Sequence, residues 1–71
     1  MSSPQLKTFL KNVRKAEDKP LDVKFNEWSA ENPGIQVINS QFYPFNEINE
    51  NNVVVNQYMC MSILFFRPSP D

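Results

Sequence analysis

The sequence contains no histidine, one cysteine and one glycine in 71 residues. Without histidine, the chain lacks the most common general base and the most common metal ligand of proteins. A single cysteine cannot form an intrachain disulfide or a structural zinc site, and a single glycine cannot build a glycine-rich phosphate loop. Cys60 has no imidazole partner, so we expect a buried thiol rather than a nucleophile. We therefore predict no enzymatic activity, no catalytic residue, no metal and no cofactor.

The chain is also short and lacks long apolar runs. A domain of 71 residues is close to the lower size limit for a self-sufficient core, and such chains often rely on a partner chain. No apolar stretch reaches the roughly 20 residues of a membrane span, and the first residues lack the apolar core of a signal peptide. The lone cysteine fits a reducing compartment. We expect one cytoplasmic domain over 1–71, with flexible ends at 1–3 and 67–71 and no membrane partner.

Charge is unevenly distributed along the chain. Residues 1–24 carry six Lys or Arg against three Asp or Glu, a net charge of +3, whereas residues 25–71 carry one Arg against five Asp or Glu, a net charge of −4. A basic segment raises the association rate with an acidic partner, and a split chain can support self-contact. An ordinary solvated surface is the alternative interpretation. Because the aromatic residues of 42–45 lie in the acidic part, we do not expect a nucleic-acid partner.

The segment 20–32 has the strongest helix pattern. Leu21, Phe25 and Trp28 follow the spacing of one helix face, and the proline before them suits a first helical turn. An Asn-Pro pair and Gly34 end the segment, because glycine adopts a left-handed conformation at little cost. We predict a helix over 20–32, with Trp28 buried against a sheet.

An antiparallel hairpin is expected after the helix. We predict strands at 35–43 and 53–66, joined by a turn that contains "NEINENN". Pro44 is expected to limit the pairing of the first strand, because proline cannot donate to a central ladder. One face of 53–66 is a core face, and the other is half apolar, which is more than a solvated face requires. The elements predict a small α+β protein with the helix packed on an antiparallel sheet.

The N-terminal segment 5–17 leaves two alternatives open. As a helix, it would place Leu6, Phe9 and Val13 on one face. As a third strand, it would alternate Lys7, Phe9 and the residues that follow. A second helix would cover the remaining face of the hairpin, whereas a third strand would leave that face to another copy of the protein.

Two stretches of the sequence resemble those of a known family. The stretch "FNEWSAENPGIQVINSQF", followed after a gap by "QYMCMSILFF", resembles a family of very short bacterial and phage proteins, some of them described as sporulation proteins. The resemblance covers about 20–66, and "LKTFL" at 6–10 would correspond to the family's first strand. It implies a β-α-β-β fold, and it implies no mechanism and no functional residues. Asn39 stands where the family usually has an acidic residue.

The half-apolar face of the last strand predicts self-association, because several large side chains exposed together would favour aggregation. The predicted interface between copies consists of Ile38, Phe42, Tyr58, Leu64 and Phe66. We also predict a partner protein, possessing an acidic surface that the basic segment would contact. The predicted partner-binding residues are Lys7, Lys11, Arg14, Lys15, Phe42, Tyr43 and Phe45. The leading prediction is therefore a non-enzymatic cytoplasmic protein that self-associates and binds or regulates a partner protein.

The alternative prediction is an oligomeric sponge or inhibitor of the phage type. Such a protein would sequester an anionic small molecule, for example a nucleotide, in a pocket between chains. Its ligand contacts would come from stacking and polar side chains. The residues of this kind are Tyr43, Asn56, Tyr58 and Arg67.

Overall fold

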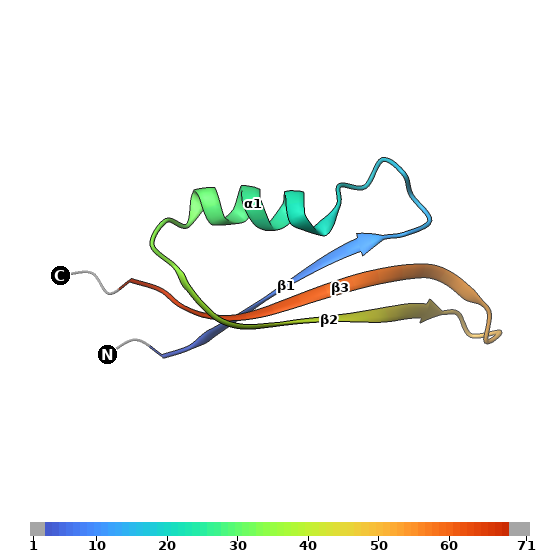
Figure 1. Ribbon diagram of the computed structural model, residues 1–71. Coiled ribbons are helices and arrows are strands. Elements are labelled where there is room, and N and C mark those ends of the chain that lie inside the picture. Colours follow the sequence, from blue (N-terminus) through green and yellow to red (C-terminus); the bar gives the residue numbers. More distant parts are fainter. Residues whose placement is uncertain (1–2, 69–71) are drawn as a thin grey trace.

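The computed structural model describes residues 3–68 and contains one helix and three strands. In chain order these are β1 (Gln5–Asn12), α1 (Leu21–Glu31), β2 (Gln36–Ile48) and β3 (Val54–Phe66). The strands form one antiparallel sheet in the order β1-β3-β2, and α1 lies on one face of it (Figure 1). The predicted α+β fold is confirmed.

The N-terminal segment predicted at 5–17 forms the third strand over Gln5–Asn12, so its helical alternative is wrong, and residues 13–17 lie in the turn that follows the strand. β1 pairs with β3 from Gln5 opposite Phe65 to Asn12 opposite Tyr58. A helix would have buried Leu6 together with Phe9, but Leu6 is 68% exposed and Phe9 only 8%. Pairing with the apolar β3 provides hydrogen-bond partners for the backbone of β1 and buries Phe9. These contacts favour the strand over the helix, although the local sequence fits both equally well.

Local signals set the two ends of α1. Pro20 precedes the helix with φ −60° and ψ 157°, an extended conformation suited to an N-cap. Gly34 follows the helix with φ +84°, a conformation that other residues adopt at a cost. A Cβ at this position would also lie 3.2 Å from the Cγ of Pro68. The helix predicted over 20–32 is therefore confirmed to within one residue at each end.

The core lies between α1 and the sheet. Its buried residues are Phe9, Met61, Ile63 and Phe65, and Leu21, Phe25, Trp28 and Ile35 pack against them. The Trp28 ring meets Phe65 edge to face at a centroid distance of 5.0 Å and meets Phe9 at 5.7 Å. Trp28 thus packs on the sheet as predicted, although its side chain is half-buried rather than fully buried.

The hairpin is longer than predicted. β2 continues from Gln36 through Pro44 to Ile48, where the sequence pattern predicted an end at 43. Pro44 stays in register opposite Met59, because β2 is an edge strand and its missing N–H removes no bond from the ladder. In the turn, Asn49 Oδ1 accepts hydrogen bonds from the backbone N–H groups of residues 51 and 53 at 2.9 and 3.1 Å.

The helix is much shorter than the hairpin that it covers. Its 11 residues span about 16 Å, whereas the 13 residues of β2 span about 43 Å. Figure 1 shows the turn end of the hairpin projecting beyond α1. Among residues 3–68, no helix is long and apolar enough to cross a membrane.

Arg67 connects the end of β3 to its neighbours. Its Nε donates to Gln5 Oε1 at 3.0 Å, and its Nη1 donates to Asn32 Oδ1 at 2.7 Å. The guanidinium also lies 5.5 Å from the centre of the Phe65 ring. Of the ends predicted to be flexible, residues 1–2 and 69–71 lie outside the described residues.

Candidate functional site

The face of the sheet opposite α1 is the candidate site, and we call it the open face. The strand registers assign alternate residues of all three strands to it. Its members are Leu6, Thr8, Leu10 and Asn12 of β1, Asn56, Tyr58, Cys60, Ser62, Leu64 and Phe66 of β3, and Gln36, Asn39, Gln41, Tyr43, Phe45 and Glu47 of β2. Glu47 is the only charged residue among them. A solvated antiparallel face normally alternates with polar and charged side chains, so this face is unusual.

A hydroxyl ladder crosses the middle of the open face. Ser62 Oγ of the central strand lies 2.9 Å from Thr8 Oγ1 on one side and 2.9 Å from the Tyr43 hydroxyl on the other. Each of these hydroxyls can donate one proton and accept others, so the three groups satisfy one another. The ladder links all three strands, and its hydroxyl groups are hydrogen-bonded to one another within the sheet.

An amide ladder crosses the same face nearer the hairpin turn. Asn12 Nδ2 donates to Asn56 Oδ1 at 3.0 Å, and Asn56 Nδ2 donates to Glu47 Oε1 at 2.6 Å. Asn12 is buried, and its Oδ1 accepts the Arg14 backbone N–H at 3.0 Å. The one carboxylate of the open face is therefore engaged by a neighbouring strand.

Apolar side chains occupy the space between and beyond the ladders. Leu10 is 46% exposed and Phe45 is 53% exposed. The rings of Phe45 and Tyr58 pack with centroids 6.2 Å apart. Cys60, which lies opposite Leu10 and Tyr43, is only 2% exposed, so the predicted buried thiol is confirmed.

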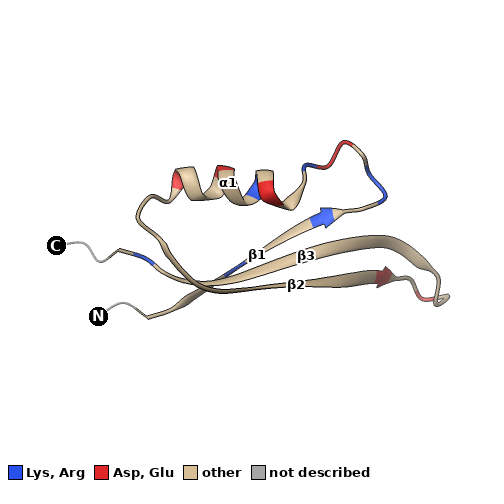
Figure 2. Cartoon of the chain, viewed as in Figure 1, with Lys and Arg blue, Asp and Glu red and all other residues tan. Residues whose placement is uncertain are grey.

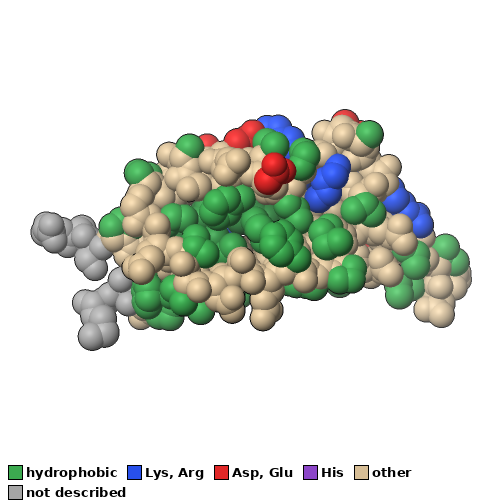
Figure 3. All heavy atoms as spheres, viewed as in Figure 1, with side chains coloured by type: hydrophobic (Ala, Val, Ile, Leu, Met, Phe, Trp, Pro, Cys, Tyr) green, Lys and Arg blue, Asp and Glu red, His purple; other side chains and the backbone are tan. Residues whose placement is uncertain are grey.

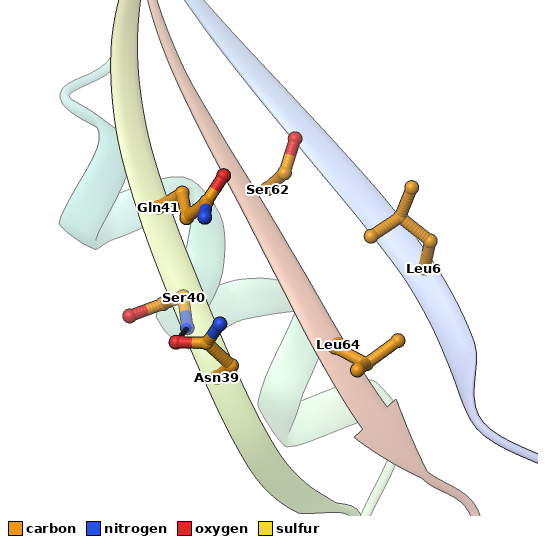
Figure 4. Close-up of a pocket in the computed structure, with 6 residues that line it drawn as sticks. All are labelled: Leu6, Asn39, Ser40, Gln41, Ser62 and Leu64. Atoms are coloured by element: carbon orange, nitrogen blue, oxygen red, sulfur yellow. Dashed lines mark hydrogen bonds between the residues drawn. The ribbon is translucent and has the colours of Figure 1, made fainter.

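A hollow of about 200 Å³ lies at the end of the open face away from the hairpin turn. Figure 4 shows Asn39 and Gln41 of β2 on one side of it, with Ser62 and Leu64 of β3 beside Leu6 of β1. Ser40 completes the lining. Small-molecule pockets usually enclose about 300–1,000 Å³. The lining contains no charged residue, so the hollow suits one apolar or amide-bonding side chain of a protein better than an anion.

Several basic residues of the N-terminal part form hydrogen bonds or ion pairs within the chain. Lys11 Nζ donates to the Lys15 carbonyl at 3.1 Å and also to the Asp18 carbonyl. Lys24 Nζ lies 2.8 Å from Asp18 Oδ1, and Lys19 Nζ lies 2.8 Å from Glu27 Oε1. The hydrogen bond from Lys24, with one from the Asn12 N–H, lowers the pKa of Asp18 below its ordinary value.

The predicted partner-binding residues do not form one surface. Figure 2 shows the basic residues of 1–24 along β1, in the turn after it and at the start of α1, while β3 separates β1 from β2. Lys7 and Lys11 share the helix side of β1 with Phe9, and Lys7 Nζ lies 5.4 Å from the Phe9 ring centre. Tyr43 and Phe45 lie on the open face two strands away.

The predicted self-association residues divide between the two sides of the sheet. Tyr58, Leu64 and Phe66 share the open face, as the sequence pattern indicated. Phe42 does not join them, because it pairs with the core residue Met61 and therefore points to the helix side. Ile38 lies at a β-bulge, where the register with β3 shifts.

The structure does not bring the predicted small-molecule-binding residues together in one site either. Tyr43 and Tyr58 lie on the open face, and Asn56 bonds to Glu47 near the hairpin turn. Arg67 lies at the opposite end of β3, where it bonds to Gln5 and Asn32. The cation that would recognise an anion is thus separated from the other polar groups.

Sequence reasoning missed the contribution of β1 to the open face. Leu6, Thr8 and Leu10 supply a third of its width, and they alternate with Lys7 and Phe9. That alternation was the signal for a strand, and it was masked by an equally good helix pattern.

A second uncovered apolar area lies on the helix side of β2. Phe42 is 64% exposed and Val37 is 43% exposed, because α1 packs on Phe9 of β1 and Phe65 of β3. Figure 3 shows hydrophobic side chains forming a band along the sheet beside the helix. The hairpin therefore exposes apolar side chains on both of its faces.

Comparison of the chain with protein-family models, with curated proteins and with solved structures finds no match. The resemblance to the short bacterial and phage family stays a prediction.

Proposed function

We propose that this chain is a non-enzymatic cytoplasmic protein that self-associates and binds or regulates a partner protein, and that the open face is the contact for the partner. The observation that carries the proposal is the composition of this face. The centres of protein interfaces are poor in Lys, Glu and Asp and rich in aromatic and apolar residues. The open face has one carboxylate, already bonded to Asn56, and four exposed or half-buried aromatic rings, those of Tyr43, Phe45, Tyr58 and Phe66.

The open face is also large enough for a stable contact. Its strands contain 8, 13 and 13 residues, which at about 3.3 Å per residue and about 4.8 Å between strands give a flat area of about 540 Å². A partner that covered it would bury about 1,100 Å² counted on both sides, which clears the roughly 1,000 Å² of a specific interface.

Self-association is supported by the small core. The buried hydrophobic residues are Phe9, Cys60, Met61, Ile63 and Phe65, whereas more large hydrophobic side chains are exposed than buried. Burying one large apolar side chain contributes roughly 1.5–3 kcal/mol. A second chain that covers some of them therefore has a substantial driving force.

The alternative, sequestration of an anionic small molecule, has weaker support. The hollow on the open face is small and lined without charge, and Arg67 is bonded elsewhere. Anion recognition normally uses a cation or converging N–H donors. We therefore favour a protein partner.

The test of partner binding is a comparison of three immobilised chains: wild type, Leu10→Asp and Ala30→Asp. Leu10→Asp places a charge among the exposed apolar side chains of the open face, whereas Ala30→Asp makes the same kind of change on the exposed surface of α1. Quantitative mass spectrometry should find a protein that wild type and Ala30→Asp retain equally and that Leu10→Asp retains at least about tenfold less. Equal retention by all three chains, with unchanged circular dichroism, would refute the assignment of the open face.

A further inference from the structure

β2 is an edge strand along its whole length. All 13 of its residues, Gln36–Ile48, are exposed, and β3 is its neighbour on one side only. A long edge strand offers a row of backbone groups to which another strand can pair. Most proteins protect such edges with lysines, short strands, bulges or a covering segment.

The other edge of the sheet, β1, has that protection. The Leu10 carbonyl accepts a hydrogen bond from Lys24 Nζ, and the Asn12 N–H donates to Asp18 Oδ2 at 2.7 Å. Lys24 and Asp18 are themselves paired at 2.8 Å. β1 is shorter, with 8 residues, and carries Lys7 and another lysine. On β2, Pro44 and the bulges near its ends are the comparable devices.

The registers show which backbone groups of β2 point outward. Successive residues of a strand direct their N–H and C=O groups alternately to its two sides. The Val13 N–H bonds the Gln57 carbonyl at 2.9 Å, so odd-numbered residues of β3 bond toward β1 and even-numbered ones bond toward β2. Since Cys60 pairs with Tyr43, the odd-numbered residues in this part of β2 face inward.

The even-numbered residues Ser40, Phe42 and Pro44 consequently direct their backbone groups outward. Two observations agree with this assignment. Pro44 has no N–H to lose on the outward side. The Ser40 N–H bonds its neighbour's Asn39 Oδ1 at 2.9 Å, as the dashed line in Figure 4 shows, instead of a strand.

We propose that a second copy of this chain pairs with the outer edge of β2, antiparallel and about a twofold axis at Gln41, so that the two three-stranded sheets become one. The inference rests on the self-association part of the proposed function and assigns its surface. This register sets Ser40 opposite Phe42 of the second copy, and each of these residues directs both its N–H and its C=O outward, where strand pairing would replace the bond from the Ser40 N–H to Asn39 Oδ1. It leaves Pro44, which has no N–H, outside the two central pairs.

Phe42 is the side chain that a second copy would cover. It points to the helix side, is 64% exposed, and lies beyond the reach of α1. In this register the two Phe42 residues are diagonal neighbours about 7–8 Å apart, within reach of aromatic contact. They would lie in the trough between the two helices, which are on the same side of the joined sheet.

Charge also favours a second copy as the occupant. A symmetric pair brings each charge of the strand close to its own duplicate, and like charges that face each other across strands are destabilising. Residues 36–46 contain no charged side chain, so this part of β2 can pair with itself without repulsion. The joined sheet would present both open faces on one side, which doubles the surface offered to the partner protein.

The decisive test is disulfide cross-linking of variants that each carry one cysteine in addition to Cys60. Gln41→Cys places a thiol at the axis, where directly opposite Cα atoms lie about 4.5 Å apart, within the range of a disulfide. Cys60 is buried and 2% exposed, so wild type should give little background. Under mild oxidation we expect most of the Gln41→Cys chain to run as a reducible dimer.

Thr8→Cys is the matched control on the open face. The proposed pairing separates the two Thr8 positions by about 24 Å, five strand spacings, so this variant should stay uncrosslinked. Thr8 lies on the open face, so cross-linking of Thr8→Cys would indicate a contact between open faces. Cross-linking of Thr8→Cys would overturn the inference whatever Gln41→Cys does, while the proposed self-association would stand.

Sedimentation of charge variants supplies a readout without added cysteines. Phe42→Asp should raise the dissociation constant of the dimer at least about tenfold, whereas Leu6→Asp, on an equally exposed residue of β1, should leave it unchanged. A wild-type dimer that dissociates with Leu6→Asp but not with Phe42→Asp would overturn the inference. A wild-type chain that is monomeric at every accessible concentration would refute both the inference and the proposed self-association.

Discussion

The ionised side chain of Asp18 connects neighbouring elements of the structure. Its carboxylate accepts from the Asn12 N–H at 2.7 Å and pairs with Lys24 at 2.8 Å. It therefore fastens the turn after β1 to both the strand and the helix. Lys24 is the principal cause of its lowered pKa. The same residues also close the outer edge of β1, so a single ion pair has two structural consequences.

This pKa predicts how stability depends on pH. Because the folded pKa is lowered relative to 3.8, the contribution of Asp18 is fully present above the unfolded value and is lost as pH falls through the folded one. Urea unfolding from pH 6 to pH 2.5 should show wild type losing part of its free energy of unfolding below about pH 4. Asp18→Asn should be less stable at pH 6 and should lack that part of the dependence.

Asp22→Asn is the control for this titration, since Asp22 is an exposed acidic residue in the first turn of α1. Its acid profile should follow that of wild type closely. If Asp18→Asn and wild type lose stability in parallel across the whole range, the role assigned to Asp18 is incorrect.

At the scale of the elements, aromatic packing is the main contact that holds α1 on the sheet. No side chain caps its N-terminus, and its residues are exposed or half-buried. Its attachment to the sheet depends on Trp28 and Phe25, which contact Phe9 and Phe65. An 11-residue helix is marginal alone, so most of its stability comes from this contact.

Trp28→Ala should therefore lower the free energy of unfolding by about 3 kcal/mol, the lower end of the range for core aromatics, because its side chain is half-buried. Chemical denaturation monitored by circular dichroism measures this loss. Glu31→Ala, at the exposed end of the same helix, should change stability by no more than about 0.5 kcal/mol. A Trp28→Ala loss as small as that of Glu31→Ala would mean that α1 does not pack as described.

At the scale of the whole molecule, the imbalance between a short helix and a long hairpin is the main feature. α1 covers less than half of the length of β2 and β3 on one face and leaves the other face uncovered, so apolar residues of the hairpin remain exposed on both faces of the sheet. Folding and self-association should therefore be thermodynamically linked. A protein stabilised by its own dimerisation melts at a temperature that depends on its concentration.

We expect the melting temperature of wild type to rise with each tenfold increase in protein concentration. Phe42→Asp, which should weaken the pairing, should melt at a temperature independent of concentration over the same range. Differential scanning calorimetry of both chains provides the measurement. The linkage would be contradicted by a wild-type melting temperature that stays constant over a range of protein concentrations well above the dissociation constant found by sedimentation.

The sequence by itself determined the elements with strong local signals. The spacing of Leu21, Phe25 and Trp28, with Pro20 before them and Gly34 after them, predicts α1 to within one residue at each end. The asparagine-rich turn and the apolar last strand predict the hairpin. Such features depend on residues close together in the chain, where propensity and turn chemistry act directly.

Only the tertiary structure decided which face each strand residue occupies. Leu6 and Thr8 reach the open face because β1 pairs with β3, a contact between residues far apart in the sequence. Phe42 points to the helix side because of its register opposite Met61, and a shift of one residue would move it to the open face. The alternation of a strand shows that two faces exist, but the register that assigns them is set by pairing and core packing between distant segments.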